Sequence, residues 1–254
     1  MDMESWGGQL LLLFIATVSN TLSAITGGGA GLIQLPLIIL LGLPFAVALA
    51  THKVASVALG VGAAIRHFRS SRLNRRTSLL VIGAGLPGVI IGANTILLIP
   101  EHIATAALGL LTIGLGLYSL GNPQLGQTPQ IIRQSHRQLA IGAAGIFFFG
   151  FLNGSLTSGT GLFVTLWLIR WFGFDYRQAI AHTLILVGLF WNSTGAITLG
   201  LQQSIQWSWL PALIAGSLIG GYLGAHLSII KGNRFIKRVF EFTAIAVGLM
   251  LLLR

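Results

Sequence analysis

Long apolar runs without charged residues divide this sequence and restrict it to a membrane fold. A helix needs about 20 apolar residues to cross the ~30 Å core of a bilayer, and several runs approach that length. Only 8% of the 254 residues are charged and 54% are hydrophobic, whereas soluble domains carry roughly 25% charged residues. We therefore predict an all-α polytopic membrane protein that forms one transmembrane domain over residues 1–254, with ten apolar segments: 8–26, 29–43, 46–65, 77–99, 102–120, 138–158, 159–173, 178–199, 208–229 and 236–253.

The N-terminus and the lack of cysteine exclude several other classes of protein. Asp2 and Glu4 precede the first apolar run without any basic residue, which is the reverse of a signal peptide, so we expect that run to be retained in the membrane. With no cysteine, disulfides, thiolate chemistry and Cys-based metal sites are excluded. The net charge of +10 lies in short loops, a pattern typical of membrane orientation. We expect no metal, no cofactor and no nucleic-acid partner.

The basic loops predict how the chain is oriented in the bilayer. Loop 66–76 contains five arginines and is cytoplasmic by the positive-inside rule. Counting the segments onward places three more basic loops on the same side: 121–137, 170–177 and 231–238. The acidic N-terminus and the loops at 100–102 and 201–209 fall outside, and the tryptophans of the latter suit an interface belt. These loops predict a multi-pass protein of the cell (inner) membrane, in contact with the lipid bilayer.

The chain also repeats itself. The stretch Gly29-Ala30-Gly31-Leu32 is matched by Gly159-Thr160-Gly161-Leu162, an offset of 130 from residue 29 to residue 159. Similarly, Gly88 and Gly92 are matched by Gly220 and Gly224, an offset of 132 from residue 88 to residue 220. Each half contains an odd number of segments, so the second half enters the bilayer from the opposite side. We predict an inverted-topology repeat of two five-segment halves: half one at 8–120, a cytoplasmic linker at 121–137, and half two at 138–254.

Glycine-rich stretches fall at matching places in the two halves, "TGGGAG" at 26–31 and "NGSLTSGTG" at 153–161. Each stands between a full-length segment and a short one, so we predict broken or short helices there. Such interruptions at corresponding positions point to a transporter's substrate site. A half-helix that starts inside the membrane presents unpaired N–H groups and the positive end of its dipole, which suit a small anion. By contrast, the four-residue spacing of Gly88/Gly92 and Gly216/Gly220/Gly224 predicts close helix packing.

Polar and ionisable residues near these breaks complete the candidate site. Lys53 lies inside the third segment, where a lysine costs about 2.5–3.5 kcal/mol to insert, and no carboxylate lies deep in any segment. A bound anion would supply the negative charge that pairs with Lys53. The alternative is that the Lys53 side chain snorkels to the lipid headgroups. His182, opposite Thr51 in the repeat alignment, and His52 are either site residues or packing histidines. The predicted substrate-binding residues are Thr26, Gly27, Gly28, Gly29, Gly31, Gln34, Lys53, Asn153, Ser158, Gly159, Thr160, Gly161 and His182.

Several stretches together resemble the TauE/SafE family, of the sulfite-exporter or toluene-sulfonate-uptake-permease type: "TGGGAGLIQLPLIILLGLP", "ALATHKVASVALGVGAAIRHFR", "GTGLFVTLWLIRWFGFDYRQA", "GLFWNSTGAITL", "LIGGYLGAHL" and "KGNRFIKR". The resemblance runs from about residue 8 to 253. It implies an inner-membrane transporter of small anions, with sulfite, sulfonates, sulfoacetate and thiosulfate as substrates. Its functional positions fall on Thr26–Gly31 and Ser158–Gly161. The second stretch reads "GSLTSGTG" where the first has a run of glycines, which leaves the symmetry of the site open.

We predict a carrier and not an enzyme, in which the two halves rock about a central site by alternating access. A passive anion channel and a purely structural scaffold are alternatives. An intramembrane serine peptidase is a third, and would need Ser155 or Ser158 beside His182 as nucleophile and base. Coupling runs through His182 and His52 or is absent, because no buried acid is available for a proton relay. Substrate identity, direction of transport and homo-oligomer formation stay open at this point.

Overall fold

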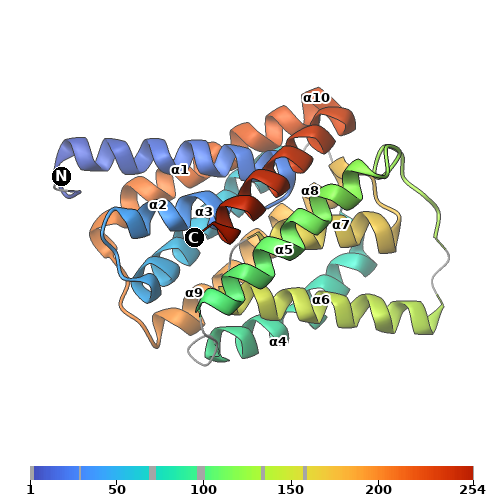
Figure 1. The fold of residues 1–254 in the computed structure, drawn as a ribbon, viewed down its shortest axis with the longest axis horizontal. Coiled ribbons are helices and arrows are strands. Elements are labelled where there is room, and N and C mark those ends of the chain that lie inside the picture. The colour runs from blue at the N-terminus through green and yellow to red at the C-terminus, as the bar shows by residue number, and fades with distance from the viewer. Residues whose placement is uncertain are drawn as a thin grey trace.

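A computed structural model describes residues 3–28, 30–68, 73–95, 101–132, 135–156 and 159–253, and within these ranges the chain contains helices and no strand (Figure 1). The predicted all-α fold is confirmed. Among the described residues, six helices are long and apolar enough to cross a membrane, and one of these, Tyr176–Gly200, is continuous through a central π-helical stretch. The elements are α1 (Trp6–Thr26), α2 (Ala30–Leu40), α3 (Phe45–His67), α4 (Arg75–Thr95), α5 (Glu101–Leu120), α6 (His136–Leu156), α7 (Thr160–Phe172), α8 (Tyr176–His182), the π-helix η2 (Thr183–Trp191), α9 (Asn192–Gly200), the 3₁₀ turn η3 (Trp207–Trp209) and α10 (Leu210–Leu252).

The last helix differs from its prediction in one respect. The sequence predicts two segments separated by a loop at 231–238, whereas α10 is helical on both sides of a single residue, Gly232. That residue has φ 77° and ψ −177°, a backbone conformation that glycine adopts without steric cost. The chain folds back on itself at this point (Figure 1). The expected loop is therefore a turn at one glycine, and α10 supplies both predicted segments.

Glycines bring two pairs of helices into close contact. A Cβ atom on Gly216, Gly220 or Gly224 of α10 would clash with the main chain of α1, and one on Gly88 or Gly92 of α4 would clash with the main chain of α6. The predicted packing role of these five glycines is confirmed. Each pair joins a helix from one predicted half to a helix from the other. Packing of this kind, between helices of different halves, is expected of a duplicated chain. The inverted relation of the two halves stays a prediction.

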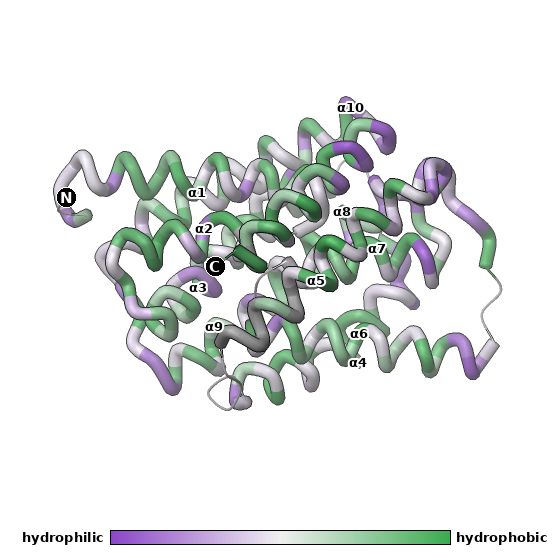
Figure 2. The backbone as a smooth tube through the Cα atoms, viewed as in Figure 1, coloured by the Kyte–Doolittle hydropathy of each residue, from purple (hydrophilic) through white to green (hydrophobic). Residues whose placement is uncertain are grey.

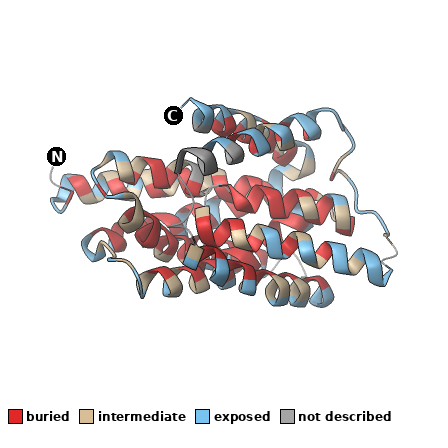
Figure 3. Cartoon of the chain, turned by 60° about the horizontal axis from the view of Figure 1, so that its bottom comes forward, coloured by how far each residue is buried: buried red, intermediate tan, exposed pale blue. Residues whose placement is uncertain are grey.

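Apolar residues predominate along the helices, and polar residues gather toward the helix ends (Figure 2). Many of the large apolar side chains are exposed. Phe14, Leu79 and Phe242, for example, are 66%, 62% and 75% exposed. Buried residues occupy the interior between the helices (Figure 3). This arrangement, apolar outside as well as inside, suits helices surrounded by lipid.

The basic loops predicted to share one side of the membrane lie together at one end of the bundle. Hydrogen bonds connect them to one another and to the nearby helix ends: Gln130 N to Gly173 O at 2.7 Å, Asn233 Nδ2 to Gln127 O at 2.8 Å, and Asn74 N to His182 Nε2 at 2.8 Å. The other end holds the N-terminal residues and loop 201–209, where Ser208 Oγ donates to Glu4 at 2.9 Å. Trp207 is exposed there, as an interface belt requires, whereas Trp209 is buried. The cytoplasmic location of the basic end stays a prediction.

Candidate functional site

Both predicted glycine breaks are present in the structure. Helices α1 and α6 begin at opposite ends of the molecule and end near its middle (Figure 1). After α1, Gly27 and Gly28 have φ values of 85° and 146°, and before α7, Gly159 has a φ of 70°. These left-handed values favour glycine, because a side chain would collide with its own backbone. The chain can therefore stop one helix and begin the next at each break.

The two breaks touch each other. A Cβ atom on Gly28 would overlap the main chain of Gly161, and a Cβ atom on Gly161 would overlap Gly28 in the same way. Helix α2 starts at Ala30 and α7 starts at Thr160, so the first turns of both helices lie close to this contact. The N–H groups of those turns and the positive ends of both helix dipoles are brought into one small region.

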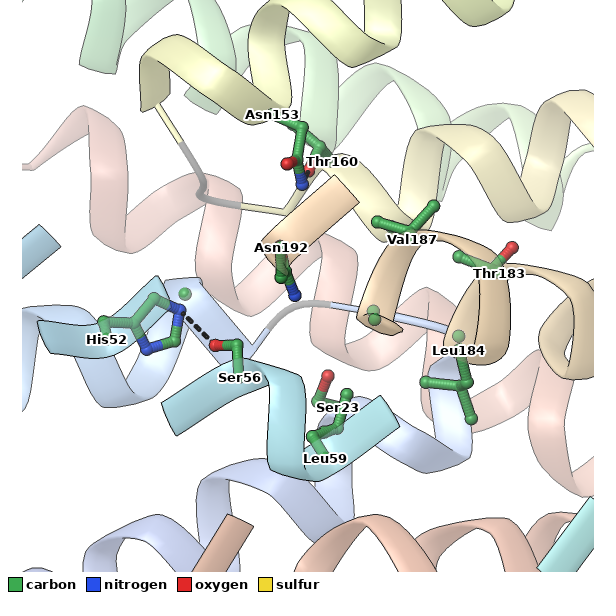
Figure 4. A pocket seen from close by; sticks show the side chains of 15 residues that line it. Ser23, His52, Ser56, Leu59, Asn153, Thr160, Thr183, Leu184, Val187 and Asn192 are labelled. Carbon is green, nitrogen blue, oxygen red and sulfur yellow. Dashed lines mark hydrogen bonds between the residues drawn. The ribbon is translucent and has the colours of Figure 1, made fainter. Parts of the chain in front are cut away.

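A cavity of about 40 Å³ lies beside the contact between the two breaks (Figure 4). Ser56, the middle residue of α3, and Gly188, the middle residue of the continuous helix Tyr176–Gly200, both line it. The cavity is therefore halfway along two full-length helices. By volume it has room for roughly three water molecules or one small ion. Its polar lining includes Ser23, His52, Ser56, Asn153, Thr160 and Asn192.

Lys53 lies directly behind this polar wall and is completely buried. Its Nζ donates to the backbone oxygen and to Oδ1 of Asn153, at 2.7 Å each, and to Oδ1 of Asn192 at 3.3 Å. Gly195 leaves room for the side chain, since a Cβ atom there would lie 3.2–3.4 Å from its last three atoms. Within the described ranges no carboxylate pairs with this ammonium group. Complete burial excludes the snorkelling alternative.

Two polar atoms on the cavity wall have no hydrogen-bond partner among the described residues. His52 Nε2 lies 3.1 Å from Ser56 Oγ, as Figure 4 shows, while His52 Nδ1 and Ser23 Oγ are buried without a hydrogen-bond partner among the residues described. An unsatisfied buried polar atom costs about 1–3 kcal/mol. Such atoms usually indicate a water, an ion or a ligand. The cavity therefore offers hydrogen-bonding groups that a bound molecule could satisfy.

The structure brings about half of the predicted substrate-binding residues to this cavity. Those on its wall are Gly27, Gly28, Gly31, Asn153, Thr160 and Gly161. Lys53 is held by Asn153, whose Nδ2 also donates to Thr160 Oγ1 at 2.8 Å. Gly159 is the residue that precedes α7. Gly29 and Ser158 lie outside the described residues.

Two predicted residues stabilise the neighbouring helices instead of lining the cavity. Thr26 Oγ1 lies 3.0 Å from the backbone oxygen of Gly28, across the end of α1. Gln34 is buried in α2, and its Oε1 accepts a hydrogen bond of 2.6 Å from Asn20 Nδ2. Both residues therefore stabilise the helices next to the first glycine break without lining the cavity.

His182 is not at the cavity, although it was predicted as a substrate-binding residue. Its Nε2 accepts from the backbone N–H of Asn74 at 2.8 Å, its Nδ1 lies 2.7 Å from Gln178 O, and it does not line the cavity. Ser155 Oγ donates to Phe151 O at 2.9 Å within its own helix. The nucleophile–base pair of Ser155 and His182 that a peptidase would need is therefore not assembled.

Sequence reasoning missed two parts of the cavity. Asn192 was detectable as an amide side chain deep inside the apolar segment 178–199. The π-helix η2, which contributes Thr183, Val187 and Gly188 to the wall, has no sequence motif. Turns of π-helix occur frequently at functional sites, and here the π-helix faces both glycine breaks.

Comparison with known proteins agrees with this architecture. The family model described as sulfite exporter TauE/SafE matches residues 11–251. The chain is 30% identical over 228 residues to a probable membrane transporter protein of Haemophilus influenzae, covering 89% of this chain and 88% of that protein. It is 26% identical over 245 residues to the probable membrane transporter protein ORF9 of Sinorhizobium, covering 96% and 92%. It is 27% identical over 227 residues to the probable membrane transporter protein YfcA of Escherichia coli K12, covering 89% of this chain and 83% of that protein. No solved structure matches the chain. With nearly its whole length matched, this multi-pass membrane protein belongs to the TauE/SafE family of membrane transporters.

Proposed function

We propose that this transporter carries small anions, of the sulfur oxoanion and organosulfonate class, by alternating access around the cavity at the two glycine breaks. The observation that carries the proposal is the environment of Lys53. This buried ammonium group is held by amide and carbonyl oxygens of Asn153 and Asn192, with no carboxylate beside it in the part of the chain described. An anion in the adjacent cavity would supply the missing negative charge.

The helix starts at the cavity favour the same sign of ligand. Anions are stabilised near helix N-termini by about 0.3–1 kcal/mol, and by up to ~2 kcal/mol in partly buried geometries. Two helices, α2 and α7, begin beside the cavity, and glycines at positions 28 and 161 allow the main chains at the two helix starts to come into contact there. Asn153 and Thr160 would orient the oxygen atoms of the anion. Gly29, Ser158 and Gly159 belong to the same two glycine-rich stretches of the sequence and stay among the proposed substrate-binding residues.

The cavity volume bears on the substrate class. About 40 Å³ suits a small inorganic oxoanion such as sulfite or thiosulfate. An organosulfonate such as sulfoacetate is larger and would require the walls to move apart. We therefore rank inorganic sulfur oxoanions first among the candidate substrates of this chain. The name of the family, sulfite exporter TauE/SafE, supports the same order.

Transport assays on reconstituted protein test this function. Proteoliposomes should take up labelled sulfite with saturable kinetics and exchange it faster when unlabelled sulfite is present on the opposite side. Gly28→Leu and Gly159→Leu should abolish uptake, because each break requires glycine. Unchanged kinetics in both variants would refute the site. Linear uptake without exchange would instead identify a passive anion channel.

A further inference from the structure

A second polar basin lies at the basic end of the bundle, between the linker and α10 just after Gly232. Its volume is about 630 Å³, within the roughly 300–1,000 Å³ of ligand sites. Arg234, Lys237, Arg238 and Glu241 line it from one face of α10, because residues three, four and seven apart share a helix face. The opposite wall is formed by Leu120 and four linker residues, Pro123, Gln124, Gln127 and Thr128. The basin shares no lining residue with the cavity near Lys53.

The charges in this basin are not balanced. Lys237 Nζ lies 2.6 Å from Glu241 Oε1, which also accepts from Ser119 Oγ at 2.9 Å. Arg234 and Arg238 are exposed, and no acidic side chain pairs with either in the described portion of the protein. Three basic groups and one carboxylate leave the basin with two positive charges in excess. Both excess charges are guanidinium groups.

The linker adds an unsatisfied hydrogen-bond donor at a fixed position. Gln127 Nε2 is buried and has no hydrogen-bond partner within the described ranges. The backbone around it is held on both sides, since Gln127 O accepts from Asn233 Nδ2 at 2.8 Å and Gly126 O accepts from Tyr176 N at 2.9 Å. A buried donor of this kind requires an acceptor. The walls of the basin therefore carry two guanidinium groups without an acidic partner among the described residues, together with the side chain of Gln127, whose backbone is held in place.

We propose that this basin binds a phosphate group, carried either by an anionic phospholipid or by a soluble phosphate compound. Guanidinium groups match phosphate oxygens with two parallel hydrogen bonds, and Gln127 would donate a further one. Basic pockets between transmembrane helices at the cytoplasmic surface are a known mode of anionic headgroup recognition. The basin lies at the end predicted to be cytoplasmic. Its ligand is separate from the transported anion.

Thermal unfolding of the full-length protein in detergent tests the proposal with two probes, phosphatidylglycerol and inorganic phosphate. Either probe, or both, should raise the melting temperature, while zwitterionic phosphatidylcholine and chloride at equal ionic strength should not. The double variant Arg234→Gln/Arg238→Gln should bind at least about tenfold more weakly, because hydrogen bonds to charged groups are lost. Gln127→Leu should weaken binding several-fold without any change in charge.

The matched control is Arg75→Gln/Arg76→Gln, two exposed arginines at the start of α4, at the same end of the protein. This control should keep the full shift. A response to phosphatidylglycerol alone identifies a lipid site, and a response to inorganic phosphate identifies a soluble ligand. Equal weakening in the control would mean a general charge effect and would overturn the proposal, as would no shift with either probe. For Gln127→Leu, the melting temperature without ligand shows whether the variant is folded, and the shift on adding ligand shows whether it binds.

Discussion

Lys53 donates two hydrogen bonds of 2.7 Å to Asn153, one to the backbone oxygen and one to the side-chain oxygen. The two residues belong to different predicted halves, so the contact ties α3 to the end of α6. Dipoles neutralise a buried charge less completely than an opposite charge does. The pair therefore leaves an attraction for an anion at the cavity wall, and this attraction can be manipulated from either residue or from Asn192.

Asn192→Asp should move stability and transport in opposite directions. The Oδ1 atom of Asn192 lies 3.3 Å from Lys53 Nζ, so a carboxylate there would form an internal ion pair and occupy the role of the substrate. We expect a rise of about 1 kcal/mol in the free energy of unfolding, which is ~2–4 °C in melting temperature, and at least tenfold slower sulfite uptake. Asn94→Asp, at the exposed C-terminal end of α4, is the control and should leave uptake unchanged without raising the stability. Normal uptake in Asn192→Asp would contradict the role of Lys53.

Lys53→Met should leave a folded protein that does not transport. Methionine keeps the volume of the side chain, and removing a buried charge offsets the loss of its hydrogen bonds. Melting curves and size-exclusion profiles should stay close to those of the natural protein, while uptake falls to the background of empty liposomes. Lys231→Met removes an exposed lysine of α10 and should transport normally. Saturable uptake in Lys53→Met would mean that the cavity binds its ligand without this cation.

Alanine at Gly161 and at Gly83 should have effects of opposite sign. Both glycines lie in helices, where alanine is favoured by about 1 kcal/mol. A Cβ atom on Gly83 would meet nothing within 4 Å, whereas one on Gly161 would collide with the main chain at Gly28. Gly83→Ala should therefore raise the melting temperature slightly, and Gly161→Ala should lower it and reduce uptake. A stabilised Gly161→Ala would show that the two breaks are not in contact.

Single cysteines can test the predicted orientation, because the natural chain has none. We expect a membrane-impermeant thiol reagent added to intact cells to label Gln202→Cys, in loop 201–209. Lys231→Cys, at the basic end, should react only after the membrane is made permeable. The positive-inside rule is the physical reason. The reverse pattern would invert the orientation and would place the phosphate basin outside.

The fold was predictable because hydropathy fixes where helices can be, and glycine fixes where they break. The contents of the cavity were less predictable, since they depend on how each helix is rotated about its axis. Lys53, Gln34 and His182 all lie in apolar segments, yet of these three only Lys53 makes hydrogen bonds to residues of the cavity wall. The hydrophobic pattern of a sequence cannot predict this rotation when nearly every face of a helix is apolar.

The repeat alignment was more informative about structure than about binding. His182 accepts a hydrogen bond from Asn74 N, and Thr51, its counterpart, accepts one of 3.0 Å from Gln206 N. Asn74 and Gln206 are themselves 132 residues apart, the offset of the predicted repeat in that region. The two residues therefore perform equivalent tasks at opposite ends of the molecule. This correspondence supports the inverted repeat and explains why His182 lies away from the cavity.

The close glycine contacts between α1 and α10 and between α4 and α6 also determine which helices can move together as rigid units. Helix α1 interlocks with α10, and α4 interlocks with α6, so each tight pair takes one member from each predicted half. A rigid rotation of one predicted half against the other would separate both helix pairs and expose their main chains to lipid. We therefore expect the rigid units of a transport cycle to be mixed helix pairs, each with one member from each predicted half, and not the two predicted halves themselves.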